Sequence, residues 1–110
     1  MVSHDHYQSC IDACIACAEA CEQCTEACKR EDPSRMARCI ALNTDCAAFC
    51  RLTAEFMTRN SEYVDLVCED CAEICKGCSD ECAKHPEAHC QECSLACLKC
   101  AEECLKMSTR

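Results

Sequence analysis

The regular spacing of cysteine along residues 10–28 is the feature that most constrains how this chain can fold. Six cysteines occur there at intervals of 4, 3, 4, 3 and 4 residues: Cys10, Cys14, Cys17, Cys21, Cys24 and Cys28. This spacing places side chains in one stripe along an α-helix that packs in a bundle. Leu or Ile normally forms such a stripe, and here it consists of thiols, in a line about 27 Å long.

Three later segments carry the same rhythm. The second stripe reads Met36, Cys39, Asn43, Cys46, Cys50, Thr53 and Met57. The third and fourth share the pattern CxxCxxxCxxCxxxC, through Cys68, Cys71, Cys75, Cys78 and Cys82, and through Cys90, Cys93, Cys97, Cys100 and Cys104. The sequence is therefore an internal repeat of cysteine-lined helices.

The breaks between these stripes predict the helix boundaries. Asp32-Pro33 predicts a helix start, because Asp is favoured at the N-cap and Pro at the first helical position. Asn60-Ser61 and His85-Pro86 mark the other breaks. We predict helices over residues 5–30, 33–59, 62–84 and 86–106.

Four helices of similar length with short connections predict an antiparallel up-down bundle. The chain of 110 residues has one Gly and two Pro, which favours long helices over a sheet. We predict that residues 1–110 form a single all-α domain, an antiparallel up-down four-helix bundle with a cysteine-lined core.

The cysteines are expected to be reduced. Their number, 19, is odd, and the N-terminal residues MVSHDHYQSC contain no apolar signal segment. Cysteines three or four residues apart on a helix also point the same way, which suits a shared ion better than a disulfide. We therefore expect a cytoplasmic protein.

Charge and hydropathy exclude two classes of partner. The formal net charge is −9, whereas nucleic-acid binding needs a basic surface. No apolar run approaches the roughly 18 residues that a membrane-spanning helix requires. We expect neither nucleic acid nor a membrane as partner.

Thiolates are soft ligands and select Cu(I), Zn(II) or iron–sulfur clusters. The spacing C-x2-C-x2-C-x3-C of iron–sulfur proteins does not occur, because two three-residue steps never follow each other. Cu(I) accepts two or three sulfurs, whereas structural zinc takes four. Thiolates that each bridge two Cu(I) ions approach one ion per thiolate and zero net charge, which suits a dry core. The upper capacity is then on the order of twenty ions.

We therefore predict storage or buffering of multiple Cu(I) ions and no enzymatic activity. A zinc or general heavy-metal buffer and, less favoured, a copper or thiol redox enzyme are the alternatives. The copper would be exchanged with a copper chaperone or a low-molecular-weight thiol.

The two ends of the predicted bundle differ. One end collects large side chains that close it: Tyr7, Met57, Val64 and Met107. The other collects soft or borderline ligands, which predict an open mouth: Cys28, Met36, Cys82, His85, His89 and Cys90.

Four residues besides the cysteines are candidate ligands. Asn43 either donates its side-chain oxygen to copper or fixes the helix register, as buried Asn does in coiled coils. Met36 is either a thioether ligand at the mouth or a cap on the core. His85 and His89 either receive incoming copper or are exposed loop residues. The predicted ligand set is the nineteen cysteines with Asn43, Met36, His85 and His89.

The chain resembles the cytosolic branch of the four-helix-bundle copper storage proteins of bacteria. The resemblance covers nearly the whole chain and rests on the four cysteine-lined helices, on Asn43 within the second stripe, and on His85 and His89 near one end. It implies storage of many Cu(I) ions along the core, uptake at the histidine end and assembly into a homotetramer.

Overall fold

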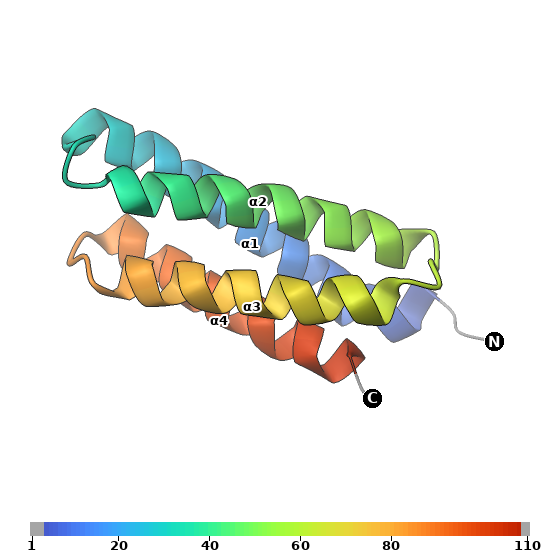
Figure 1. The fold of residues 1–110 in the computed structure, drawn as a ribbon. Coiled ribbons are helices and arrows are strands. Elements are labelled where there is room, and N and C mark those ends of the chain that lie inside the picture. The colour runs from blue at the N-terminus through green and yellow to red at the C-terminus, as the bar shows by residue number, and fades with distance from the viewer. Residues whose placement is uncertain (1–3, 109–110) are drawn as a thin grey trace.

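The computed structural model describes residues 4–108, with side chains from residue 6 onward. It contains four α-helices: α1 (His4–Glu31), α2 (Ala37–Thr58), α3 (Val64–Ala83) and α4 (Ala88–Met107). They run alternately up and down in one bundle (Figure 1), and the described residues contain no strand. The predicted all-α up-down four-helix bundle is confirmed.

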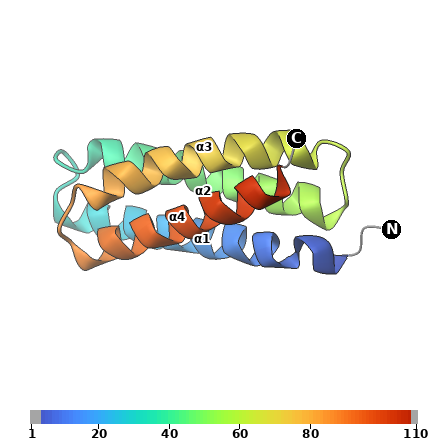
Figure 2. The same cartoon turned by 90° about the horizontal axis from the view of Figure 1, so that it is seen from below.

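Each helix packs against two others. The contacting pairs are α1 with α2, α2 with α3, α3 with α4, and α4 with α1, so α1 lies diagonally opposite α3 (Figure 2). The resulting rod measures 49 × 20 × 18 Å. Small residues that flank the cysteine stripes, such as Ala18, Ala72 and Ala101, are buried and allow the helices to approach closely.

The rod has two unlike ends. We call one the His89 end; it contains residues 24–39 and 81–91, with the α1–α2 and α3–α4 connections (Figure 1). We call the other the Met57 end; it contains residues 7–10, 57–68 and 104–107, with the α2–α3 connection, the start of α1 and the end of α4.

The prediction that the second helix starts at Pro33 was wrong. Residues 33–36 form a turn, and α2 begins at Ala37. Asp32 still caps a chain segment, because its carboxylate accepts the Arg35 amide (3.2 Å) and its carbonyl accepts the Met36 amide (2.9 Å). The capped segment is this turn, and it carries Met36 into the core, where its side chain is fully buried.

The remaining boundaries lie within about two residues of those predicted. After α2, Asn60 adopts a left-handed conformation (φ 54°), which Asn tolerates better than most residues. The Ser61 amide then bonds the Phe56 carbonyl at 3.0 Å, which closes the end of α2. α3 starts at Val64, and α4 starts at Ala88, two residues beyond Pro86.

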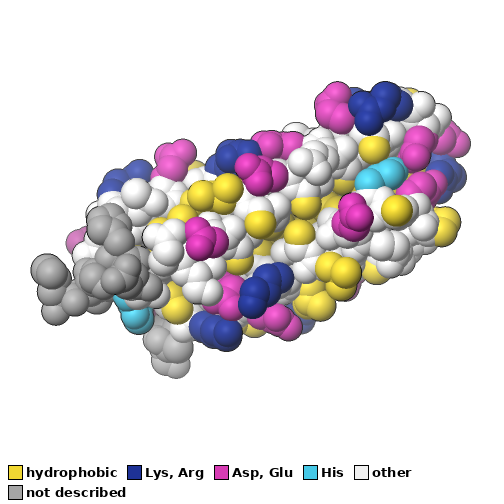
Figure 3. Space-filling view, turned by 180° about the vertical axis from the view of Figure 1, so that it is seen from behind, with side chains coloured by type: hydrophobic (Ala, Val, Ile, Leu, Met, Phe, Trp, Pro, Cys, Tyr) yellow, Lys and Arg dark blue, Asp and Glu magenta, His cyan; other side chains and the backbone are white. Residues whose placement is uncertain are grey.

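The surface of the bundle is charged with apolar interruptions. On the face formed by α1 and α4, acidic and basic side chains surround scattered hydrophobic ones (Figure 3). Leu95, Leu98 and Leu105 of α4 are among the exposed apolar residues. No helix in the described part of the chain is long and apolar enough to cross a bilayer.

Candidate metal centre

All nineteen cysteines lie in the described part of the chain, and all carry free thiols. Each is at most 1 % exposed to solvent. The four stripes therefore converge on one interior, as the spacing predicted, and the core of the bundle is built largely of sulfur.

The sulfur atoms form a nearly continuous line along the bundle axis. Ten of them succeed one another at separations of 3.5–3.9 Å, in the order Cys10, Cys104, Cys14, Cys100, Cys50, Cys46, Cys17, Cys97, Cys21 and Cys93. Most of these steps cross from one helix to another. An ion held by one pair thus always has further sulfurs within reach.

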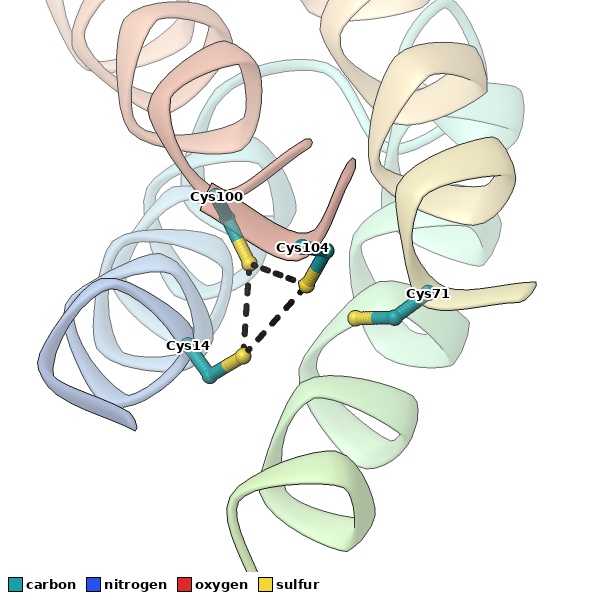
Figure 4. Close-up of side chains that lie close together, drawn as sticks. All are labelled: Cys14, Cys71, Cys100 and Cys104. Carbon is teal, nitrogen blue, oxygen red and sulfur yellow. Dashed lines mark hydrogen bonds between the residues drawn. The ribbon is translucent and has the colours of Figure 1, made fainter. Parts of the chain in front are cut away.

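The Cys14, Cys100 and Cys104 sulfurs form a triangle with sides of 3.6, 3.8 and 4.0 Å, and Cys71 points toward it from α3 (Figure 4). With metal–sulfur bonds of about 2.3 Å, a three-coordinate ion needs sulfurs about 4.0 Å apart, and a linear two-coordinate ion about 4.6 Å. These three sulfurs are therefore spaced for a three-coordinate ion.

Similar groups recur along the core. Four sulfurs within 4.8 Å of one another are contributed by Cys17, Cys50, Cys75 and Cys100, by Cys17, Cys21, Cys46 and Cys97, and by Cys21, Cys78, Cys93 and Cys97. The groups share members, so a sulfur of one belongs also to the next. This sharing is the arrangement that bridging thiolates require.

Asn43 is fully buried in the sulfur line. Its Oδ1 accepts hydrogen bonds from the thiols of Cys78 (3.0 Å), Cys93 (3.3 Å) and Cys82 (3.4 Å). Its amide nitrogen donates to Cys39 at 3.6 Å. The oxygen therefore links sulfurs of α3 and α4. It takes the place that a cysteine sulfur would have at this position of the α2 stripe.

His89 joins a group of thiols at one end of the core. Its Nδ1 lies 3.4 Å from the Cys24 sulfur and 3.5 Å from the Cys90 sulfur, and Cys28 completes the group. Its Nε2 lies 2.9 Å from a Glu31 carboxylate oxygen. Burial opposes the imidazolium form, but the bonds to Cys24 and Glu31 outweigh it and raise the pKa of His89.

Glu31 had not been predicted to have a role. It follows Cys28 by three residues at the end of α1, and only the packing of α4 beside α1 brings it to His89. A carboxylate that accepts Nε2–H holds the neutral ring with Nδ1 free to bind metal, as in many metalloproteins.

The prediction of an open mouth at the His89 end was wrong. Cys28, Cys82 and Cys90 are fully buried there, and Met36 covers the core from the turn before α2. Polar contacts between the two halves of the bundle lie outside these residues: the ion pairs of Arg35 with Glu87 and of Arg38 with Glu81, and the hydrogen bond of His89 with Glu31.

His85 lies at the same end but is engaged elsewhere. Its Nε2 is 3.0 Å from a Glu81 carboxylate oxygen, and this bond lowers the pKa of Glu81. The structure therefore places one of the two predicted histidines against sulfur and the other against a carboxylate.

Burial favours the neutral form of three thiols at the His89 end, those of Cys28, Cys39 and Cys90. Burial raises the pKa of Cys28 to about 12. Burial also raises the pKa of Cys39 and of Cys90. A metal ion that binds these sulfurs must therefore displace protons.

The Met57 end is closed by apolar contacts. Met57 and Val64 are buried, and the half-buried Tyr7 and Met107 pack against the core cluster. The Met57 sulfur lies 3.9 Å from the Cys68 sulfur. From the sequence, a closing role was favoured over a ligand role for Met57, although its place on the cysteine stripe of α2 indicated that its sulfur faces the other thiols.

Comparison with known proteins agrees with this geometry. A family model described as copper storage protein matches residues 3–109. An uncharacterized cysteine-rich protein of Bacillus subtilis, YhjQ, is 40 % identical over 83 residues, which cover 74 % of this chain and 77 % of that protein.

Two solved structures are similar in both fold and sequence. The Cu(I)-bound copper storage protein BsCsp3 superposes with a TM-score of 0.90 at 39 % identity, covering 94 % of this chain and 98 % of the other. A cytosolic copper storage protein from Streptomyces lividans, solved with five coppers, superposes with a TM-score of 0.90 at 34 % identity, covering 96 % and 93 %.

Proposed function

The chain belongs to the copper storage protein family, and on this premise we propose that it stores multiple Cu(I) ions as thiolate-bridged sites inside its bundle. The observation that carries the proposal is the line of buried, reduced sulfurs with successive separations of 3.5–3.9 Å. Soft ligands at this spacing suit a soft ion in low coordination.

Charge favours Cu(I) over Zn(II) as the stored ion. The groups of four sulfurs would also match a tetrahedral zinc site in shape. However, each zinc bound by four thiolates carries a charge of −2, and the buried residues of the described chain include no Lys or Arg to balance it. One Cu(I) per bridging thiolate leaves no net charge, so a filled core escapes the cost of burying unpaired charge.

We propose that copper enters at the His89 end. His89 Nδ1 and the thiols of Cys24, Cys28 and Cys90 form the first group of ligands behind the surface ion pairs. Met36, buried beside them, supplies a thioether, and His85 joins once it leaves Glu81. Surface ion pairs contribute little stability, so opening them costs little.

Inward transfer proceeds by ligand exchange between neighbouring sulfurs. The Asn43 oxygen, within 3.0–3.4 Å of three thiols, provides a neutral donor at the step between Cys82 and Cys93. Release would follow the same route outward, to a copper chaperone or a low-molecular-weight thiol that competes for the ion.

We further infer a cytosolic protein without enzymatic activity that assembles as a homotetramer. The cytosolic relative from Streptomyces lividans supports the location. Exposed apolar side chains support assembly. They include Leu95 and Leu98 on α4 and, beside a groove of about 510 Å³ between α2 and α3, Leu52.

Anaerobic titration of the metal-free protein tests the proposal. With a Cu(I)-specific chelator in competition, the protein should take up many equivalents of Cu(I), toward an upper limit of roughly one per cysteine. Zn(II) should be displaced readily in a parallel experiment. Zinc that resists competition better than Cu(I) would establish a zinc buffer instead, and rapid catalytic oxidation of thiols by the loaded protein would indicate a redox enzyme.

A further inference from the structure

The Met57 end of the bundle contains a layer to which each helix contributes one sulfur. Its members are Cys10 of α1, Met57 of α2, Cys68 of α3 and Cys104 of α4. The stripe of α2 contains no cysteine beyond Cys50. Its next member is Thr53, whose hydroxyl donates a hydrogen bond to the Phe49 carbonyl. Met57 is the next residue of the α2 stripe after Thr53, and it again provides a sulfur atom.

The contacts place this thioether among thiols. Met57 Sδ lies 3.9 Å from Cys68 Sγ, and Cys10 Sγ lies 3.7 Å from Cys104 Sγ. Cys10, Cys68 and Cys104 all belong to the same buried core cluster. All four side chains are at most 1 % exposed. A separation of 3.9 Å is close to the roughly 4.0 Å between two ligands of a three-coordinate ion with bonds of about 2.3 Å.

We propose that Met57 is a copper ligand and that this layer is a terminal Cu(I) site, which rests on the proposed storage of copper. A thioether carries neither a charge nor a proton. It therefore adds a soft donor at this buried end of the core without adding negative charge and without a proton to displace. Cys68 and Met57 bind the ion together, with Cys10 or Cys104 as the third ligand.

The apolar surroundings of the site are consistent with a final position for copper. Val64 is buried beside it, and Tyr7 and Met107 pack against the core at the same end. The buried Glu103 bonds Ser9 of α1 at 2.9 Å and two lysines of α4, which ties α1 to α4 outside the layer. The four side chains of the layer are buried among the described residues, so an ion here would be reached through the sulfur line.

The test uses protein in which selenium replaces the sulfur of every methionine, loaded anaerobically with Cu(I) to saturation. X-ray absorption at the selenium edge should show a selenium–copper shell. Met57→Leu should diminish this shell and lower the capacity by one Cu(I) equivalent, because Leu fills the volume without a donor atom. Met107→Leu, at the same end, is the matched control and should leave both quantities unchanged.

A second variant keeps the test decisive if Met57→Leu folds poorly. Met36→Leu/Met107→Leu retains Met57, and its selenium–copper shell should persist. A loaded protein whose shell is unaffected by Met57→Leu, or absent from the double variant, would overturn the site and leave copper storage standing. A protein that takes up no Cu(I) would overturn the storage function and the site with it.

Discussion

The two ends of the bundle enclose the same sulfur core with different chemistry. At the His89 end, ion pairs such as Arg35–Glu87 and Arg38–Glu81 join the halves of the molecule across the surface. At the Met57 end, Val64 is buried and Tyr7 and Met107 pack against the core. Opening the His89 end replaces surface ion pairs by contacts with water, which costs little free energy. Opening the Met57 end exposes apolar side chains to water, which costs more.

A buried metal-binding core can therefore be covered at both ends and still admit copper at one of them. Neither end exposes a cysteine. What distinguishes them is how readily each opens, because local opening is easiest where few buried apolar contacts must be broken. The predictions below test whether copper really travels from one end to the other.

The largest effect is expected from interrupting the sulfur line at its middle. The sulfurs of Cys17, Cys46 and Cys97 lie 3.5–3.9 Å from one another. Cys17→Ala/Cys46→Ala/Cys97→Ala should remove at least three Cu(I) equivalents, at roughly one per thiol. It should also slow filling of the Met57 end by at least tenfold, about 1.4 kcal/mol in the transfer barrier.

Filling of the Met57 end can be followed by the methionine methyl resonances during anaerobic titration, and thermal unfolding checks that the variant folds. Cys17→Ala alone is the control, since Cys46 and Cys97 remain 3.9 Å apart. It should lose one equivalent and fill at the normal rate. Equal filling rates in the triple variant would mean that copper also enters at the Met57 end.

The next largest effect is expected on the rate of Cu(I) uptake when either histidine is replaced. His89→Ala removes a nitrogen that lies 3.4 Å from the Cys24 sulfur, and it should slow Cu(I) uptake on the order of tenfold, as loss of a ligand-shell residue commonly does. His85→Ala should have the smaller effect, because that ring contacts Glu81. Stopped-flow absorbance of the forming copper–thiolate bonds measures both. The reverse order of effects would move the uptake site to His85.

A smaller change is expected from Glu31→Gln. The amide keeps the size of the carboxylate but loses the charge that holds His89 Nε2–H, 2.9 Å away. Affinity of the first bound copper should fall about tenfold, at the lower limit for such supporting residues. Chelator competition measures it, and the dependence of uptake on pH should shift with it. Glu26→Gln, an exposed acid on the same helix, is the control.

The smallest expected effect is a dependence of the stability of the metal-free protein on pH. The folded state raises the pKa of Cys28 to about 12, above the ordinary thiol value of 9.0. The folded state therefore binds more protons than the unfolded state between pH 9 and pH 12. Stability should be unaffected below pH 9 and should fall across this window, by at most about 1.4 kcal/mol per pH unit for each such thiol.

Anaerobic denaturant unfolding at pH 8 and pH 10 measures this effect. Cys28→Ala should reduce the slope, and Cu(I)-loaded protein should show little of it because its thiols have already lost their protons. Stability that rises with pH in the metal-free protein would contradict a neutral Cys28 thiol in the folded state.

Much of the fold could be predicted from residue spacing alone. The steps of three and four between cysteines require helices, and the absence of any other equally continuous apolar stripe requires those faces to meet. Local signals for helix ends were less reliable than this spacing. Asp32 does cap the turn that follows it, but local preference did not show that α2 would begin only at Ala37.

The candidate site was predictable in composition and less so in geometry. The softness of thiol ligands and the position of Asn43 on the second stripe follow from residue identity and helical period. The approach of Met57 to a thiol was not predicted, because methionine on a stripe indicates core packing as readily as a ligand. Its 3.9 Å approach to Cys68 depends on how α2 and α3 are aligned.

Residue spacing was enough to establish a bundle of four helices around a core of soft ligands, because helical period and the need for a buried face act along each segment separately. Three features depend on how the helices pack: Met36 and ion pairs cover the predicted mouth, Glu31 reaches His89, and neighbouring sulfurs lie 3.5–4.0 Å apart. These features join residues of different helices. They depend on the rotation and axial register of packed helices, which no local pattern specifies.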